Sequence, residues 1–93
     1  MREIERTTQF RRDYKREARG KHRATLESGL AAVLLPLMQD LAPAERFRDH
    51  PLAGEWAGLR DCHVKPDLVL IYEKAGATIL RLVRLGSHSE LGL

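Results

Sequence analysis

The first 20 residues contain two segments whose apolar and polar positions predict secondary structure. Residues 2–6 alternate charged side chains around a single isoleucine, which predicts a short edge strand. A helix is predicted next, because aromatic or small apolar residues recur at four-residue intervals: Phe10, Tyr14 and Ala18. A threonine at position 7 or 8 can cap this helix, and Gly20 is expected to end it.

A broader apolar stripe predicts a second helix over about residues 22–40. Its members recur at three- and four-residue intervals: Leu26, Leu30, Val33, Leu34, Leu37 and Leu41. Pro36 is expected to kink or split this helix, because proline removes a backbone donor and clashes with the preceding turn. Residues 42–58 contain two prolines and two glycines, so they are predicted to form a long ordered loop, which in a compact domain is often functional.

Three strand candidates follow the loop, at residues 59–64, 68–74 and 78–85, with turns at Pro66-Asp67 and Gly76. An antiparallel meander is the simplest arrangement. The middle strand is apolar on both faces, as a central strand covered by helices would be. We therefore expect an α+β fold in which two N-terminal helices pack on a small antiparallel sheet, with residues 1–93 forming one domain.

The composition is that of a folded protein, because 43% of the 93 residues are hydrophobic and 31% are charged. The longest apolar stretch, residues 30–38, is much shorter than the roughly 20 residues that span a bilayer. The first residues lack the apolar region of a secretory signal. Cys62 is the only cysteine and cannot form an internal disulfide. These features predict a cytoplasmic protein with no membrane contact.

Positive charge is concentrated near the start of the chain. The net charge is only +3, but residues 1–23 contain nine Lys or Arg against four Asp or Glu. A basic patch favours nucleic acid, because neutralising phosphates releases counterions, although a solvated helix face would have the same pattern. The candidate RNA-binding residues face outward on the predicted first helix: Arg11, Arg12, Lys15, Arg16 and Arg19.

Titratable side chains gather around the predicted sheet: His50, His63, Asp67 and His88, with Arg60, Arg81 and Arg84 nearby. Metal-free RNA cleavage needs a base for the 2′-hydroxyl, an acid for the leaving oxygen and cations for the developing charge. Imidazole suits proton transfer because it titrates near neutrality. Zinc is disfavoured, because the chain has no second cysteine and no paired histidine spacing. We expect no metal and no cofactor.

Each candidate also has a structural interpretation. His50 could anchor the loop, His63 could make a hydrogen bond on its strand, and Asp67 could simply shape a turn. Trp56, the only tryptophan, could fill the core beneath the loop or stack on an RNA base. His88 lies in a predicted irregular tail beyond the last strand, where a core role is disfavoured.

Two stretches together resemble the YafQ branch of the RelE toxin family. The first comprises His50-Pro51-Leu52, Gly54, Trp56, Gly58, Arg60-Asp61, His63-Val64, Pro66-Asp67 and Leu70-Ile71-Tyr72. The second is Arg84-Leu85-Gly86-Ser87-His88-Ser89-Glu90-Leu91. They cover about the last half of the chain, and the predicted helix order agrees in the first half. One departure is that Gly92 and Leu93 stand where family members usually have a phenylalanine.

The resemblance implies a RelE-like β-α-α-β-β-β fold and a toxin of a type II toxin–antitoxin system. Such a toxin is a ribosome-dependent endoribonuclease that cleaves messenger RNA in the ribosomal A site and inhibits translation. It implies an acid–base group of His50, His63, Asp67 and His88, with Trp56 as a supporting residue. Arg60 and Arg84 are weaker candidates for phosphate contacts, because arginines on a sheet often serve only ion pairing.

The implied partners are messenger RNA, ribosomal RNA and an antitoxin protein, the latter in a heterotetrameric or larger complex. Two alternatives stay open. A non-catalytic ParE-like toxin would bind DNA gyrase, but the clustered histidines disfavour it. A basic nucleic-acid-binding module would need only the first helix and would leave the loop and tail patterns unexplained.

Overall fold

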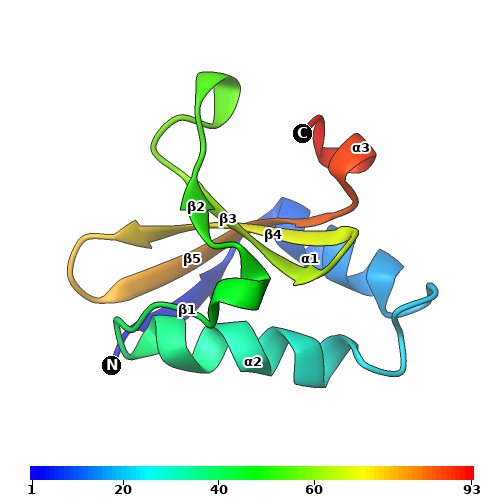
Figure 1. Cartoon of the computed structure of the whole chain (residues 1–93), viewed down its shortest axis with the longest axis horizontal. Coiled ribbons are helices and arrows are strands. Elements are labelled where there is room, and N and C mark those ends of the chain that lie inside the picture. Colours follow the sequence, from blue (N-terminus) through cyan, green and yellow to red (C-terminus); the bar gives the residue numbers. More distant parts are fainter.

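The computed structural model describes residues 1–93, as a five-stranded sheet with two helices packed on one face (Figure 1). The strand order is β1-β5-β4-β3-β2. The principal elements are β1 (Glu3–Arg6), α1 (Thr8–Glu17), α2 (Leu26–Met38), β3 (Arg60–Lys65), β4 (Leu68–Ala75) and β5 (Ile79–Gly86). The predicted α+β class and the antiparallel meander of β3, β4 and β5 are confirmed.

The sheet is mixed, because β1 pairs in parallel with β5, with Glu3 opposite Ile79. The antiparallel prediction therefore fails at this edge. The connection between β1 and α1 is fixed by Thr7, whose hydroxyl donates to the backbone carbonyl of Val83 in β5 at 2.8 Å. The same oxygen accepts the N–H of Phe10 at 3.0 Å, which caps α1 as predicted.

Both helices are shorter than predicted. α1 ends at Glu17, and Ala18 is exposed rather than part of the packed face. Gly20 does not end the helix through a left-handed conformation, because its N–H simply closes a tight turn onto the carbonyl of Glu17. α2 begins only at Leu26, because residues 21–25 form a turn.

Pro36 does not split α2, which continues to Met38. The proline lies in the last turn of the helix, and its missing N–H removes a single intrahelical hydrogen bond, the one to the carbonyl of Ala32. Leu41, predicted on the apolar stripe, lies beyond the helix and is 55% exposed. None of the helices is long and apolar enough to span a bilayer.

The central strand β4 is apolar on both faces, but the two long helices cover only one face of the sheet. On that face α1 and α2 bury a cluster that includes Phe10, Leu30, Val33, Leu37, Leu70, Tyr72, Leu82 and Leu85. On the other face Val69 and Ile71 of β4 pack with Leu91 and with the half-buried Trp56. The expectation of helices over β4 is thus right for one face. Loop segments and one short helix cover the other (Figure 1).

The predicted loop at residues 42–58 has structure of its own. It contains two single 3₁₀ turns, η1 (Glu45–Phe47) and η2 (Gly54–Trp56), on either side of the two-residue strand β2 (His50–Pro51). β2 pairs antiparallel with β3, which places His50 opposite Asp61. Phe47 is buried in the core and anchors η1. The loop is therefore the outer edge of the sheet, and its residues have fixed positions.

Candidate active site

Three histidines and one aspartate meet on the sheet face that α1 and α2 leave uncovered. His50 comes from β2, His63 from β3 and His88 from the short helix α3 (His88–Leu91). The ring centroids of His63 and His88 are 4.9 Å apart, and those of His50 and His63 are 6.3 Å apart. Asp67 lies in the turn between β3 and β4 and contacts His88. The four residues expected to act together are thus neighbours.

His88 is held in place by a helix start that the sequence reading did not predict. The expected irregular tail is the helix α3, which Ser87 begins through a capping box with Glu90. The Ser87 hydroxyl accepts the N–H of Glu90 at 3.2 Å, and the Glu90 carboxylate accepts the N–H of Ser87 at 2.8 Å. Leu91 packs into the cluster beneath. His88 therefore has a defined position at the first residue of the helix.

Asp67 binds His88 twice. Its Oδ1 atom accepts the ring Nδ1–H at 2.9 Å and lies 3.3 Å from the backbone N–H of the same residue. These bonds hold the pKa of Asp67 below its ordinary value, so the side chain is a carboxylate at neutral pH. Because Nδ1–H is donated to Asp67, the Nε2 atom of His88 is left to exchange a proton with a substrate.

His50 is oriented by the backbone. Its Nδ1 atom lies 2.6 Å from the carbonyl oxygen of Arg48, which accepts the ring N–H. Arg48 adopts a left-handed conformation, with φ of 52°, which is uncommon for a residue with a side chain. This conformation directs the carbonyl toward the imidazole.

Asp61 belongs to the same group, although it was not among the predicted site residues. Its side chain is 4% exposed, and its Oδ1 atom lies 3.1 Å from Nδ1 of His50 without forming a hydrogen bond. Burial raises the pKa of Asp61. Burial also lowers the pKa of His63, and the charge of Asp61 opposes that shift. The alternation of Asp61 and His63 along one strand was the signal that could have identified it.

The arginines predicted near the site are ion-paired within the chain. Nη2 of Arg60 lies 2.9 Å from a carboxylate oxygen of Asp49, which raises the pKa of the guanidinium. Nε of Arg84 lies 2.8 Å from the buried carboxylate of Asp13. Arg81, which the sequence also places near the site, binds two glutamates. Phosphate binding by Arg60 and Arg84 stays a prediction.

The predicted basic patch separates into one ion-paired residue and four free ones, of which Arg19 lies just beyond the end of α1. Arg16 lies 3.1 Å from Asp13 and 3.3 Å from Glu90, and it donates to the carbonyl of Leu85 at 2.8 Å. It therefore joins α1 to β5 and α3. The other four cations are exposed and form no ion pair: Arg11, Arg12, Lys15 and Arg19.

Trp56 makes the packing contacts expected of a residue that fills the core beneath the loop. It is half-buried and lies against the cluster of Val69, Ile71 and Leu91. This cluster supports both η2 and α3, so Trp56 connects the loop with the helix that carries His88. A stacking role toward RNA stays a prediction.

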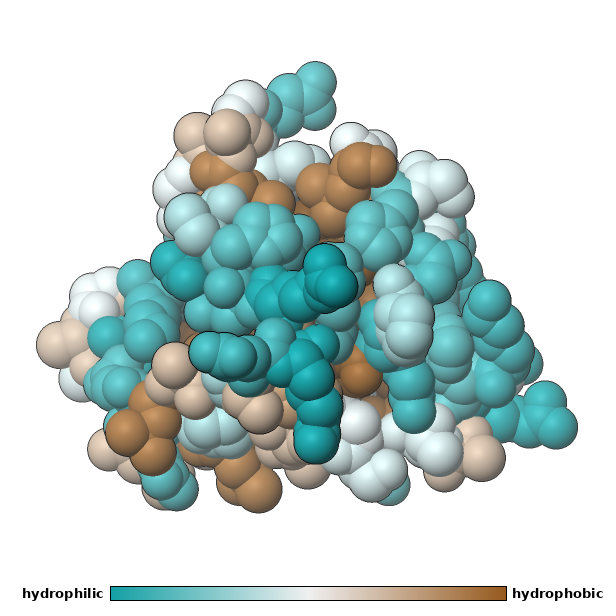
Figure 2. Space-filling view, in the orientation of Figure 1, coloured by the Kyte–Doolittle hydropathy of each residue, from teal (hydrophilic) through white to brown (hydrophobic).

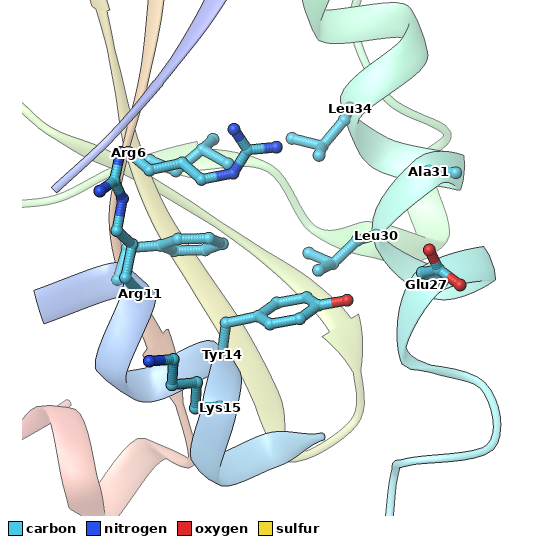
Figure 3. A pocket seen from close by; sticks show the side chains of 10 residues that line it. Arg6, Arg11, Tyr14, Lys15, Glu27, Leu30, Ala31 and Leu34 are labelled. Atoms are coloured by element: carbon cyan, nitrogen blue, oxygen red, sulfur yellow. The ribbon is translucent and has the colours of Figure 1, made fainter. Parts of the chain in front are cut away.

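The molecule has two pockets, and only one adjoins the histidines. The first, of about 500 Å³, lies between α1 and α2, where Tyr14 points toward Leu30 and Arg6 toward Leu34 (Figure 3). It has an apolar floor and no histidine or aspartate. The second, of about 560 Å³, is lined by residues 46–48 and 63–66. No three His, Cys, Asp or Glu side chains are grouped closely enough to hold a metal ion.

Comparison with known proteins places the chain among bacterial toxins. The family model described as the bacterial toxin of type II toxin–antitoxin system, YafQ, matches residues 2–92. The mRNA interferase toxin YafQ of Escherichia coli K12 is 37% identical over 92 residues, which are 98% of this chain and 96% of the relative.

Two similar solved structures have different partners. A structure of the Escherichia coli DinJ–YafQ complex has a TM-score of 0.80 and 35% identity, with 98% of each chain covered. A metal-bound toxin from Helicobacter pylori also has a TM-score of 0.80, with 38% identity and 98% and 99% of the two chains covered.

Proposed function

Because the chain belongs to the YafQ family of type II toxin–antitoxin toxins, we propose that it is an mRNA interferase that cleaves messenger RNA on the ribosome. The cut would fall in the A site, would need no metal and would inhibit translation. The observation that carries the proposal is the hydrogen-bonded pair of His88 and Asp67 next to His63, with 4.9 Å between the imidazole centroids. Because its proposed substrate is messenger RNA on a translating ribosome, the toxin would act in the cytoplasm.

The proposed reaction divides proton transfer between two imidazoles. The lowered pKa of His63 keeps this ring uncharged at neutral pH, so it can accept the proton of the 2′-hydroxyl. The 2′-oxygen attacks phosphorus and the bond to the 5′-oxygen breaks. His88 donates a proton to that oxygen, and the Asp67 carboxylate stabilises the positive ring beforehand. The products are a 2′,3′-cyclic phosphate and a free 5′-hydroxyl.

His50 and the buried Asp61 complete the group on the β2 side of His63. His50 is a third acid, base or phosphate donor, with the carboxyl group of Asp61 beside its ring. Arg60, Arg84 and Trp56 are proposed to contact the substrate. Each arginine would contact a phosphate of the substrate while it stays paired with its own carboxylate, and the ring of Trp56 would stack on a base.

The first test measures cleavage on programmed ribosomes. The toxin is freed of transition metals with a chelator and then mixed with ribosomes in magnesium buffer. We expect cleavage at one position of the A-site codon with cyclic phosphate ends, and little cleavage of the same RNA without ribosomes. If cleavage instead requires one equivalent of added zinc or copper, the histidines are metal ligands. This control is included because a similar toxin has been solved with a metal bound.

The same preparation separates the alternatives. A ParE-like toxin would inhibit DNA supercoiling by gyrase and leave messenger RNA intact, and a binding module would do neither. As in the DinJ–YafQ complex, we propose that a cognate antitoxin binds this chain, in a heterotetramer or larger assembly. Co-expression with the product of a neighbouring reading frame, followed by mass measurement of the complex, tests this partner.

We further propose that the free cations of α1 contact ribosomal RNA. Replacing Arg12 and Lys15 by glutamate should weaken ribosome binding and reduce the slope of log affinity against log salt by roughly one unit per lost phosphate contact. Sedimentation with ribosomes over a salt series measures both quantities. An unchanged slope would identify the patch as a solvated helix face.

A further inference from the structure

The pocket beside His63 carries charge that the reaction described above does not use. Its walls are the 3₁₀ turn η1 with Arg48, and the β3 end at residues 63–66. One wall carries the positive charges of Arg46 and Arg48, the other carries that of Lys65, and no carboxylate lines the pocket. The face that carries η1 and β2 is strongly hydrophilic at its centre (Figure 2).

These three cations have no carboxylate or hydrogen-bond partner within the chain. Arg46, Arg48 and Lys65 form no ion pair, and none of their side chains makes a hydrogen bond. Arg60 and Arg84, the arginines that the sequence favoured, are both neutralised by carboxylates. An anion is therefore attracted more strongly to the pocket than to the paired arginines, because no internal carboxylate has to be displaced.

The cations are positioned as part of the site. The guanidinium of Arg46 lies over the ring of the buried Phe47, 4.7 Å from its centroid, and this cation–π contact restricts the side chain. Arg48 holds His50 through its backbone carbonyl. Its positive charge also helps to lower the pKa of His63, which places the guanidinium within electrostatic reach of the proposed base.

We propose that this pocket binds a phosphodiester of the substrate RNA next to the one that is cleaved. The inference rests on the proposed function, because it needs an RNA strand at His63. Since His63 itself lines the pocket, an RNA whose 2′-hydroxyl reaches this imidazole continues into the cationic space. A volume of about 560 Å³ accommodates one nucleotide. The three cations then neutralise a phosphate that does not react.

The test compares binding with turnover. The variants are Arg46→Gln, Arg48→Gln and Lys65→Gln, and the control is Lys74→Gln, which removes one exposed charge near the other end of β4. Binding is measured to ribosomes whose messenger RNA carries a 2′-deoxy nucleotide at the cleavage position. We expect Kd and KM to rise roughly tenfold for each pocket variant, the size of one charged contact, while the control is unchanged. For Arg46→Gln and Lys65→Gln, which replace residues not used in the proposed proton transfers, kcat should stay at the parental value.

Salt dependence and a conservative substitution make the result specific. Each pocket variant should reduce the slope of log affinity against log salt by about 0.7, the value for a single-stranded phosphate. Arg48→Lys should restore the slope, because it keeps the charge at the same backbone position. Thermal melting identifies any variant that has lost its fold. If one has, the result for Arg46→Gln decides whether the subsite exists, because Arg46 is exposed and its replacement should leave the fold intact.

The possible outcomes are distinct. If the parent protein does not cleave messenger RNA on ribosomes, the proposed function is wrong. If the parent cleaves and the folded pocket variants keep its Kd, KM and salt slope, the subsite is wrong. If they retain RNA binding but lose affinity for the antitoxin, the pocket receives acidic side chains of that protein, and the RNA assignment is overturned.

Discussion

Replacing His88 by alanine is expected to slow cleavage of ribosome-bound messenger RNA at least 100-fold without unfolding the protein. General acid–base catalysis contributes roughly 10² to 10⁴ in rate, and His88 is the imidazole that a carboxylate prepares for proton donation. The ring is only half-buried, so its removal leaves no large cavity in the core. Single-turnover kinetics with saturating toxin measure the chemical step directly.

Further variants test whether His63, Asp67 and His88 act together in the same chemical step. His63→Ala and Asp67→Asn should also be impaired, and either combined with His88→Ala should lose less than the product of the separate effects. Ser89→Ala is the matched control, because Ser89 is the exposed neighbour of His88 on α3. A folded His88→Ala protein that cuts at the parental rate would refute the proton-donor assignment.

Replacing Asp13 by alanine should have the largest effect on stability, lowering the free energy of unfolding by about 3 kcal/mol. The Asp13 side chain is 3% exposed and accepts the backbone N–H of Leu85 at 2.9 Å. It also pairs with Arg84 and Arg16. Without the carboxylate, Arg84 and the buried N–H of Leu85 lose their acceptor, and Arg16 loses one of its partners. For a domain of this size the melting temperature should fall by more than about 10 °C.

Asp13→Asn is the control that separates charge from shape. The amide oxygen can still accept the N–H of Leu85, but it cannot neutralise the arginines. We therefore expect the free energy of unfolding of Asp13→Asn to lie between those of the parent and of Asp13→Ala. Urea denaturation followed by circular dichroism measures all three proteins. If Asp13→Ala unfolds at the parental urea concentration, the carboxylate does not hold α1 to β5.

Local patterns were sufficient to predict much of this molecule. The helical spacing around Phe10 and Leu30 and the strands at residues 60–86 depend on neighbours in the sequence, and both agree with the structure. The proximity of His63 and His88 also followed, because an antiparallel meander brings the ends of its strands together. The turn at Asp67 needed only its proline and its position between two strands.

Pairings between distant residues could not be predicted in this way. The contacts of Asp13 with Arg84 and of Asp49 with Arg60 neutralise arginines that look available in the sequence, and nothing local reveals either carboxylate partner. The same holds for His50, whose loop becomes a strand only by pairing with β3. Helix ends were misplaced by a few residues because Gly20 can also form a tight turn. The short α3 depends on a cap and one buried leucine, too few residues to produce a periodic pattern.

The parallel pairing of β1 with β5 has a consequence for how the toxin is made. β1 is synthesised first of the strands, yet its only neighbour in the sheet is β5, the last to leave the ribosome. A nascent chain therefore cannot close this edge until β5 has emerged, and His88 lies two residues after the end of β5. Assembly of the candidate site is thus a late event in synthesis, as is the closure of this edge of the sheet.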